Sequence, residues 1–297
     1  MSVHPSTSRN PSTSSSDLRF VADINITEFM RHLSRTAPGC ELEEYEGTVL
    51  FAGAHANPSP YRNAMIRFKS VLPEEEALAF AEAFFAKRNR AFVMWVRGGE
   101  DAVLERIAQT RRLRILEADG LPQLARRGAP DLAQPRDGVE LVFVDDDETR
   151  EAFVRINANA WGLEGVAFDL VRRILFDPDA LKAPNVTAAL AYLDGKPAST
   201  CLALIHPWQV GGGGVAEEMV AGGYWGATEP WATQRGLHDL CTRAAFHSAA
   251  RMGATVMVCQ NSPGAAKNIA RMGFEQVGTF RRYLVPAGAH LSTPLAG

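Results

Sequence analysis

The feature that most constrains the fold of this chain is one stretch, residues 224–239, which reads YWGATEPWATQRGLHD. A strand predicted over 219–228 leads into it, Pro230 then ends the strand, and Gly236 precedes a long amphipathic helix predicted over 237–252. A helix start leaves several backbone N–H groups without partners, and the helix dipole adds partial positive charge there. The stretch therefore predicts a strand, a turn and a helix N-terminus that suits a phosphate group.

The residues on either side continue an alternation of strand and helix. Residues 254–260 form a short apolar run that predicts a buried strand, and residues 261–274 read NSPGAAKNIARMGF. Upstream, strands are predicted at 187–193 and 198–206, joined by Asp194-Gly195, a dipeptide typical of a two-residue hairpin turn. These elements predict an α/β fold with a mixed sheet.

Together these motifs resemble the acyl-CoA core of the GNAT N-acetyltransferases. In that superfamily the loop before the helix reads roughly Pro-x-x-Arg-Gly-x-Gly-x-Gly. Aligning Pro230 places Gly236 at the central glycine, with Arg235 before it. Further family positions are matched by Asn261, Ala265, Gly273 and Phe274. The resemblance implies a GNAT fold with acetyl-CoA, or another acyl-CoA, as co-substrate.

Three positions depart from the family pattern. The first arginine of the loop is Thr233, its last glycine is His238, and the tyrosine that protonates the departing CoA thiolate is Ile269. A Cβ and an imidazole at position 238 are expected to crowd a phosphate, although a protonated His238 could donate a hydrogen bond to it. A thiol with a pKa of roughly 8.5 can leave with help from water, so the missing acid slows the reaction without forbidding it.

The resemblance extends over the rest of the chain. Residues 138–197 look like the first part of a GNAT domain in chain order. The first half is predicted as α-β-β-α-β-α-β, which resembles a GNAT domain with pieces lost. The first six of these elements are predicted near 26–34, 48–55, 64–69, 74–88, 91–96 and 101–112. We therefore expect two GNAT-like domains in tandem, similar to bacterial two-domain GNAT proteins with a degenerate first domain. The expected boundaries are a disordered tail over 1–17, a degenerate domain over 18–127, a linker over 128–138 and the acyl-CoA-binding domain over 139–297.

Composition argues against several classes of function. A length of 297 residues fits two domains. A net charge of −3 without a basic run argues against nucleic acid as a partner. The four cysteines are scattered without disulfide or metal spacing, so no metal is expected. Because no apolar run could span a bilayer and no signal peptide is recognisable, we expect a cytoplasmic protein without a membrane partner.

The predicted contacts to acyl-CoA are mainly backbone groups of the loop and of the strand before it. GNAT enzymes use a splayed strand whose amides run along the pantetheine, and residues 226–229 stand in the matching place. Gly222 and Gly223 suit a bulge there, or simply a weak strand. The predicted cofactor-binding residues are Ala227, Thr228, Glu229, Gln234, Arg235, Gly236, Leu237, His238, Asp239 and Asn261.

Candidates for removing a proton from the acceptor are Glu229 and Tyr224, either of which could act through a water. Each has a structural alternative: Glu229 as a turn carboxylate, and Tyr224 as a packing aromatic beside Trp225. The aromatic residues Trp161, Phe168 and Phe176 form either an apolar acceptor wall or part of the core.

The function these residues predict is N-acetyl (acyl) transfer from acyl-CoA to a primary amine by direct attack. The acceptor is a small molecule or an aminoacyl group. The alternative is a CoA-binding regulatory protein or pseudo-enzyme, which His238 and Ile269 suggest. A homodimer is compatible with the sequence.

Overall fold

The computed structural model describes residues 15–57, 59–69, 71–161, 168–175, 178–209 and 217–288. Residues 1–14 of the expected tail lie outside this part of the chain. The first helix, α1, runs from Ser15 to Thr36 and is therefore much longer than the predicted segment 26–34.

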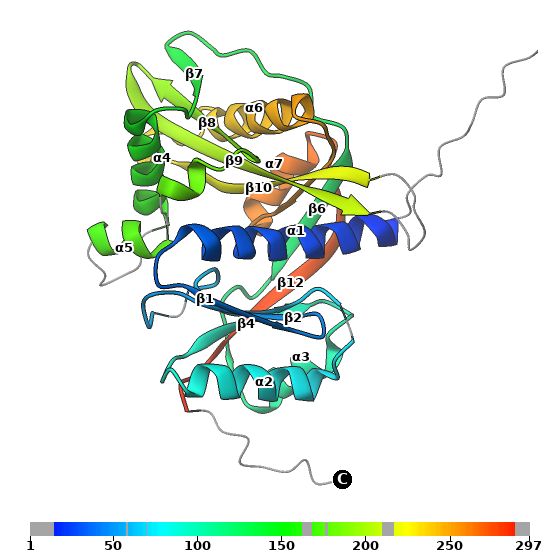
Figure 1. The fold of residues 1–297 in the computed structure, drawn as a ribbon. Helices are drawn as coiled ribbons and strands as arrows, with labels where there is room; N and C mark the ends of the chain where they lie inside the picture. The colour runs from blue at the N-terminus through cyan, green and yellow to red at the C-terminus, as the bar shows by residue number, and fades with distance from the viewer. Residues whose placement is uncertain are drawn as a thin grey trace, which may run out of the picture.

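The elements of the two halves follow one another along the chain as strands and helices in mixed order (Figure 1). After α1 the first half contains β1 (Glu41–Tyr45), β2 (Thr48–Ala52), β3 (Asn63–Arg67), α2 (Glu74–Ala86), β4 (Phe92–Arg97), α3 (Ala102–Thr110), β5 (Arg114–Ile115) and β6 (Leu121–Arg127). The second half contains β7 (Val139–Phe143), α4 (Asp147–Ala160), α5 (Phe168–Leu175), the 3₁₀ turn η1 (Pro178–Leu181), β8 (Val186–Leu193), β9 (Lys196–Gln209), β10 (Glu217–Thr228), η2 (Pro230–Ala232), α6 (Leu237–Arg251), β11 (Ala254–Gln260), α7 (Pro263–Ala270) and β12 (Glu275–Val285).

The predicted hairpin is confirmed. Strands β8 and β9 pair antiparallel on either side of Asp194 and Gly195. Both turn residues have positive φ, 50° and 73°, as a two-residue turn that follows strand twist requires.

All described strands belong to one 12-stranded sheet, in the order β1-β2-β3-β4-β12-β6-β11-β10-β9-β8-β7, with β5 paired to β12. The last strand of each half completes the sheet of the other half: β6 lies beside β11, and β12 lies beside β4. These two exchanged strands pair with each other and join the halves. The predicted ranges 18–127 and 139–297 therefore interlock in space.

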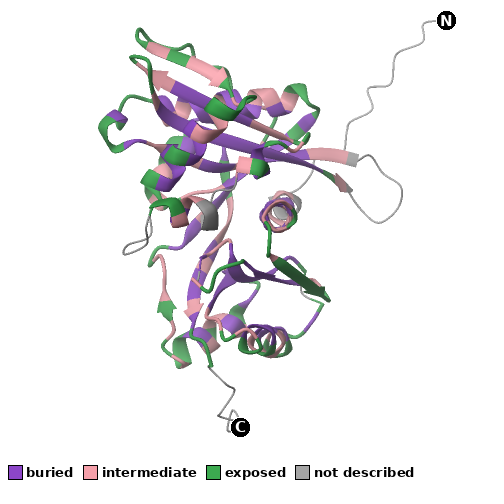
Figure 2. Ribbon diagram, turned by 60° about the vertical axis from the view of Figure 1, so that its left-hand side comes forward, coloured by how far each residue is buried: buried purple, intermediate pink, exposed green. Residues whose placement is uncertain are grey.

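Helices cover both faces of this sheet, and α1 crosses the middle of the molecule between the halves (Figure 1). Helices α6 and α7 pack on one face of β8–β11, whereas α4 packs on the other. Phe29 and Leu33 of α1 share one buried cluster with Phe51 of β2, Trp95 of β4 and Leu204 of β9. Buried residues consequently run through the strands of both halves, while the edge strand β1 is exposed (Figure 2).

None of the described helices combines the length and apolar character needed to cross a membrane.

Candidate functional site

Strands β10 and β11 separate in the middle of the sheet. They pair in parallel only as far as Gly223 and Cys259. Beyond this point β10 follows β9, and β11 follows β6, where the Asn261 N–H donates to the Pro122 carbonyl. The sheet therefore opens between two strands that are parallel neighbours.

A β-bulge marks the opening on the β10 side. The register with β9 shifts between Tyr224 and Ala227, and Trp225 adopts a φ of 49°, unusual for a bulky residue. Of the two alternatives left open for Gly222 and Gly223, a bulge or a plain strand, the structure shows the strand, because both glycines pair regularly. The glycines instead allow neighbouring side chains to pack closely against the strand. A Cβ at position 223 would lie only 2.8 Å from the ring of Phe246.

Buried side chains of β9 fix the bulge. The Ser199 hydroxyl donates to the Ala227 carbonyl at 2.8 Å, and the Thr200 hydroxyl donates to the Trp225 carbonyl at 3.0 Å. Thr200 in turn accepts a hydrogen bond from Asn157 of α4 at 3.0 Å. These contacts satisfy carbonyls that the irregular register leaves without a strand partner, and they therefore stabilise the bulge.

The N-terminus of α6 faces this bulge with unused donors. Gly236 precedes the helix with a φ of 77°, and Gln234 has a φ of 63°. Within the described part of the chain, the amides of residues 236–239 donate to no protein acceptor. A row of such amides at a helix start attracts an anion.

An open cleft of about 630 Å³ lies against these amides. Its walls include the linker residue Arg136, Arg235 of the loop and Arg271 after α7. None of these three arginines forms an ion pair with a described carboxylate, whereas Asp239 at the same cleft pairs with Arg243 at 2.8 Å. The cleft is therefore electropositive and suited to phosphate groups.

A second, more enclosed cavity of about 380 Å³ lies in the opening between β10 and β11. It is lined by residues 223–226 of β10, residues 259–262 at the end of β11, Phe246 of α6, Ile269 of α7, Phe29 of α1 and Tyr61. Gly222 faces Asn25 of α1 and Gly223 faces Phe246 of α6, so these two helices lie on opposite faces of β10. The cavity therefore passes through the sheet.

No protein-family model and no curated protein matches the sequence, but solved structures match most of the chain. A GCN5-related N-acetyltransferase from Kribbella flavida has a TM-score of 0.64 at 20% identity, over 92% of this chain and 98% of that one. A tandem GNAT protein from the clavulanic acid biosynthesis pathway has a TM-score of 0.53 at 13% identity, over 93% and 96%. A GCN5-related N-acetyltransferase from Sphaerobacter thermophilus has a TM-score of 0.52 at 14% identity, over 94% and 95%.

The chain has the GNAT fold. Because these matches span both halves, the predicted arrangement of two GNAT-like units in tandem is confirmed as a fold.

His238 occupies the junction between the cleft and the cavity of this GNAT fold, since it lines both. Its imidazole is directed at the bulge, where a Cβ on Gly226 would lie 2.5 Å from Nε2. Desolvation in this enclosed position lowers the pKa of His238 below its usual value, so the ring is neutral at pH 7. The lowered pKa therefore argues against the expected donation from a protonated His238 to a phosphate, whereas the His238 backbone amide belongs to the row of amides at the cleft.

The two candidates for proton removal have different surroundings. Tyr224 lines the central cavity, stacks on Phe29 at 3.8 Å, and donates its hydroxyl hydrogen to Asn25. Burial raises the pKa of Tyr224 well above its usual value, so the hydroxyl stays protonated at neutral pH and no phenolate is present to take a proton. Glu229 lines neither cavity, and its carboxylate accepts a hydrogen bond from Asn159 of α4 at 2.8 Å.

The other predicted contacts divide between the two cavities. Thr228, Gln234, Arg235, Leu237 and Asp239 line the electropositive cleft together with Gly236. Asn261 lines the central cavity, where its side-chain oxygen is buried without a partner in the described structure. Ala227 is buried and lines neither space. Ile269, at the position of the family's tyrosine, is 1% exposed and faces the central cavity.

The far wall of the central cavity comes largely from the first half and from β12. Tyr61, Glu117, Leu121 and Arg282 line it, and none was predicted from the sequence. The local sequence around these residues does not indicate a site, because they reach the cavity only through the pairing of the exchanged strands. Of the three predicted aromatic wall residues, Trp161 lines the cavity, Phe168 is exposed and lines neither space, and Phe176 lies outside the described residues.

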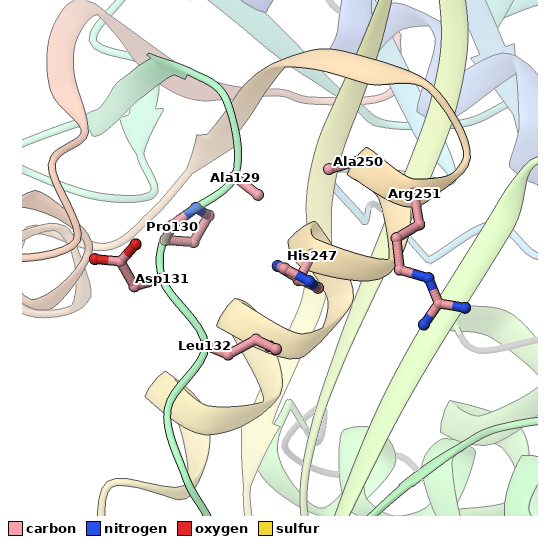
Figure 3. A pocket seen from close by; sticks show the side chains of 7 residues that line it. All are labelled: Ala129, Pro130, Asp131, Leu132, His247, Ala250 and Arg251. Atoms are coloured by element: carbon pink, nitrogen blue, oxygen red, sulfur yellow. The ribbon is translucent and has the colours of Figure 1, made fainter.

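A separate hollow of about 410 Å³ lies where the linker runs along α6 (Figure 3). Pro130 and Leu132 of the linker face His247 of α6 across it, and Arg243 holds the linker by donating to the Asp131 carbonyl at 2.9 Å. It shares no lining residue with the two cavities above. The described residues contain no cluster of His, Cys, Asp and Glu suited to a metal ion.

Proposed function

We propose that this chain is an N-acyltransferase. It takes the acyl group from acetyl-CoA or another acyl-CoA and transfers it to the primary amine of a small-molecule or aminoacyl acceptor. One observation carries the proposal: an electropositive cleft at a helix N-terminus meets an enclosed cavity at a splayed, bulged strand, with His238 lining both.

The cleft and the cavity, which share His238 as a lining residue, each suit one end of an acyl-CoA. The amides of residues 236–239 would hold the pyrophosphate, and Arg136, Arg235 and Arg271 would neutralise its charge and that of the 3′-phosphate. The pantetheine arm would then pass His238 into the opening between β10 and β11. A bound acyl-CoA supplies a thioester carbonyl that the acceptor amine attacks.

Ile269 favours a second function, CoA binding without efficient turnover. Its alkyl side chain cannot protonate a departing thiolate, and general-acid help is typically worth about 10²–10⁴-fold in rate. The two functions differ in whether thiol is released, not in whether CoA binds.

Calorimetric titration of the full-length protein with acetyl-CoA, and separately with CoA, tests the proposal. We expect micromolar binding of both, and acceptor-dependent release of CoA thiol from acetyl-CoA. Arg235→Glu should weaken binding by at least about tenfold, since it reverses one charge of the cleft. Arg251→Glu, at the opposite end of the same helix, is the matched control and should leave binding unchanged. No binding up to millimolar concentrations overturns both functions, and binding without thiol release leaves the second.

A further inference from the structure

The walls of the central cavity indicate the chemical class of the acceptor, an inference that rests on the proposed acyltransferase function. The α6 and α7 side of the cavity includes His238, which also lines the phosphate cleft, so we assign this side to the donor. The α1 side is walled by the first half, including Phe29 and Tyr61, and is the side left for an acceptor.

The acceptor side is built mainly of aromatic rings. Phe29 stacks on Tyr224 with 2° between the rings, and meets Tyr61 edge to face at 5.9 Å and Trp225 at 5.6 Å. Trp161 adds a fifth ring that is 54% exposed and therefore lies at the solvent boundary. Rings arranged in this way favour a flat, apolar ligand.

The charges of the cavity are already neutralised by one another. Glu117 is the one carboxylate among the described lining residues, and Arg282 holds both its oxygens, with Nε at 2.9 Å from Oε2. Arg282 itself lies over the Trp95 ring at 4.9 Å. An ammonium group entering this cavity finds no uncommitted carboxylate, and burying an unpaired charge is costly.

The titratable groups of the acceptor side also lack a good base. Glu117 is engaged by Arg282, and the Tyr224 phenol donates to Asn25. An aliphatic ammonium such as that of lysine has a pKa of about 10.4 and must lose a proton before it can attack. An amine attached directly to an aromatic ring is a much weaker base and is already uncharged at neutral pH.

We propose that the acceptor is a small aromatic amine, bound as the free base among Phe29, Tyr61, Trp161, Tyr224 and Trp225. Its nitrogen lone pair forms the N–C bond to the thioester carbonyl carbon as the C–S bond breaks. The proton lost from nitrogen balances the proton taken up by the sulfur. The products are an aromatic amide and CoA thiol.

The test compares acceptor amines that differ in whether they contain an aromatic ring and whether the amine is charged at neutral pH. It uses the full-length protein and acetyl-CoA, and it detects the released thiol. We expect kcat/KM for 4-methoxyaniline to exceed that for benzylamine by at least about tenfold. Spermidine and kanamycin should show no turnover above the background without acceptor. Faster turnover of benzylamine or of either polycation overturns the proposal.

Binding of 4-methoxyaniline is also measured without CoA, by saturation-transfer NMR, so that the acceptor cavity is tested even when acetyl-CoA fails to bind. Absence of both acetyl-CoA binding and aniline binding overturns the proposed function and this inference together. Aniline binding without acetyl-CoA binding would support the cavity as a site for an aromatic amine but would overturn the proposed acyltransferase function. Acetyl-CoA binding without aniline binding overturns this inference alone.

Variants locate the acceptor within the fold. Trp161→Ala and Tyr61→Ala should each raise KM for 4-methoxyaniline by at least about tenfold while leaving acetyl-CoA binding unchanged. Tyr45→Ala, on the exposed edge strand β1, is the matched control and should leave KM unchanged. Arg282→Met frees the Glu117 carboxylate and should shift preference toward benzylamine. No effect of either wall variant, with acetyl-CoA binding intact, overturns the assignment.

Discussion

Ile269 is a buried side chain of α7 that lines the central cavity, the space proposed to receive the thioester. We expect Ile269→Tyr to raise kcat by at least about tenfold, part of the 10²–10⁴-fold typical of general-acid catalysis. KM for acetyl-CoA should change little. Steady-state thiol release measures both constants.

The control for this variant is Ile269→Phe, which adds the ring without the hydroxyl and should leave kcat unchanged. Equal rates for the tyrosine and phenylalanine variants would show that a proton donor at position 269 does not assist departure of the thiol.

Tyr224 is the residue whose structural and catalytic roles are easiest to separate. Its hydroxyl donates to the side-chain oxygen of the fully buried Asn25, whose side-chain nitrogen has no partner in the described structure. Removing the hydroxyl in Tyr224→Phe leaves a buried amide unsatisfied, so we expect the free energy of unfolding to fall by about 1–3 kcal/mol. Denaturant unfolding measures this loss. A drop in kcat of a hundredfold or more at unchanged stability would instead indicate a proton-transfer role.

Residues that belong to a recognisable local motif could be identified from the sequence. The loop at 233–239 is predicted from the strand, the turn and Gly236, and Asn261 from the resemblance; the structure places the loop at the cleft and Asn261 at the central cavity. The sequence could not indicate where side chains point, and two examples show this. The Glu229 carboxylate turns toward α4, and the His238 ring turns toward the bulge, because burial and hydrogen bonding with distant elements decide both.

The bulge of β10 and the first turn of α6 form one unit at the level of elements. Gly226 and His238 are in such close contact that a methyl group on Gly226 must displace the imidazole. We expect Gly226→Ala to weaken acetyl-CoA binding by about tenfold, because the ring moves into the passage between the cavities. In a His238→Ala background the same change should cost less than about twofold, since the space is then vacant.

Calorimetry on the two single variants and the double variant measures this coupling. Equal losses in both backgrounds would mean that Gly226 acts through the strand itself and that His238 does not control the passage.

Elements with strong periodicity or turn chemistry were predicted close to their observed bounds. The strand 254–260 agrees with β11, and the hairpin at Asp194-Gly195 joins β8 to β9. The position of the bulge could not be predicted, because a glycine marks a weak position in a strand without showing whether it forms a bulge or allows close packing. Here Gly223 makes room for Phe246, while the irregular position falls on Trp225.

At the scale of the whole molecule, a buried polar network ties the halves together. Asp23 of α1 is 2% exposed, accepts from Gln123 of β6 at 2.7 Å and lies 3.9 Å from Arg97 of β4. Burial raises the pKa of Asp23 from 3.8 to about 6, against the opposing effects of Gln123, Arg97 and Arg19. The folded state therefore binds this proton more tightly than the unfolded state. The stability it contributes is fully present below pH 3.8 and is lost as pH rises through about 6.

Asp23→Asn removes this titration while keeping an oxygen that can accept from Gln123. The free energy of unfolding of the variant, relative to the natural chain, should rise by up to about 3 kcal/mol across that window. Urea unfolding at several pH values measures the difference. A difference that stays constant or shrinks as pH rises would show that Asp23 is not the group responsible.

The strand exchange could not be predicted, since pairing between distant strands leaves no trace in local patterns. The exchange determines whether one half can fold without the other. A fragment of residues 139–297 lacks β6, the neighbour of both β11 and β12, and also β4, the other neighbour of β12. It also lacks α1, so Leu204 of β9 and Tyr224 of β10 lose their packing against Phe29.

We therefore expect residues 139–297 to aggregate when produced alone, because unpaired strand edges and bare apolar surface promote association. Co-production with residues 1–138 should restore a soluble complex that binds acetyl-CoA. The full chain should unfold in one transition, with fluorescence and circular dichroism coinciding. A monomeric 139–297 fragment with native-like circular dichroism would show instead that the exchanged strands are dispensable, and that the second unit folds as an independent domain.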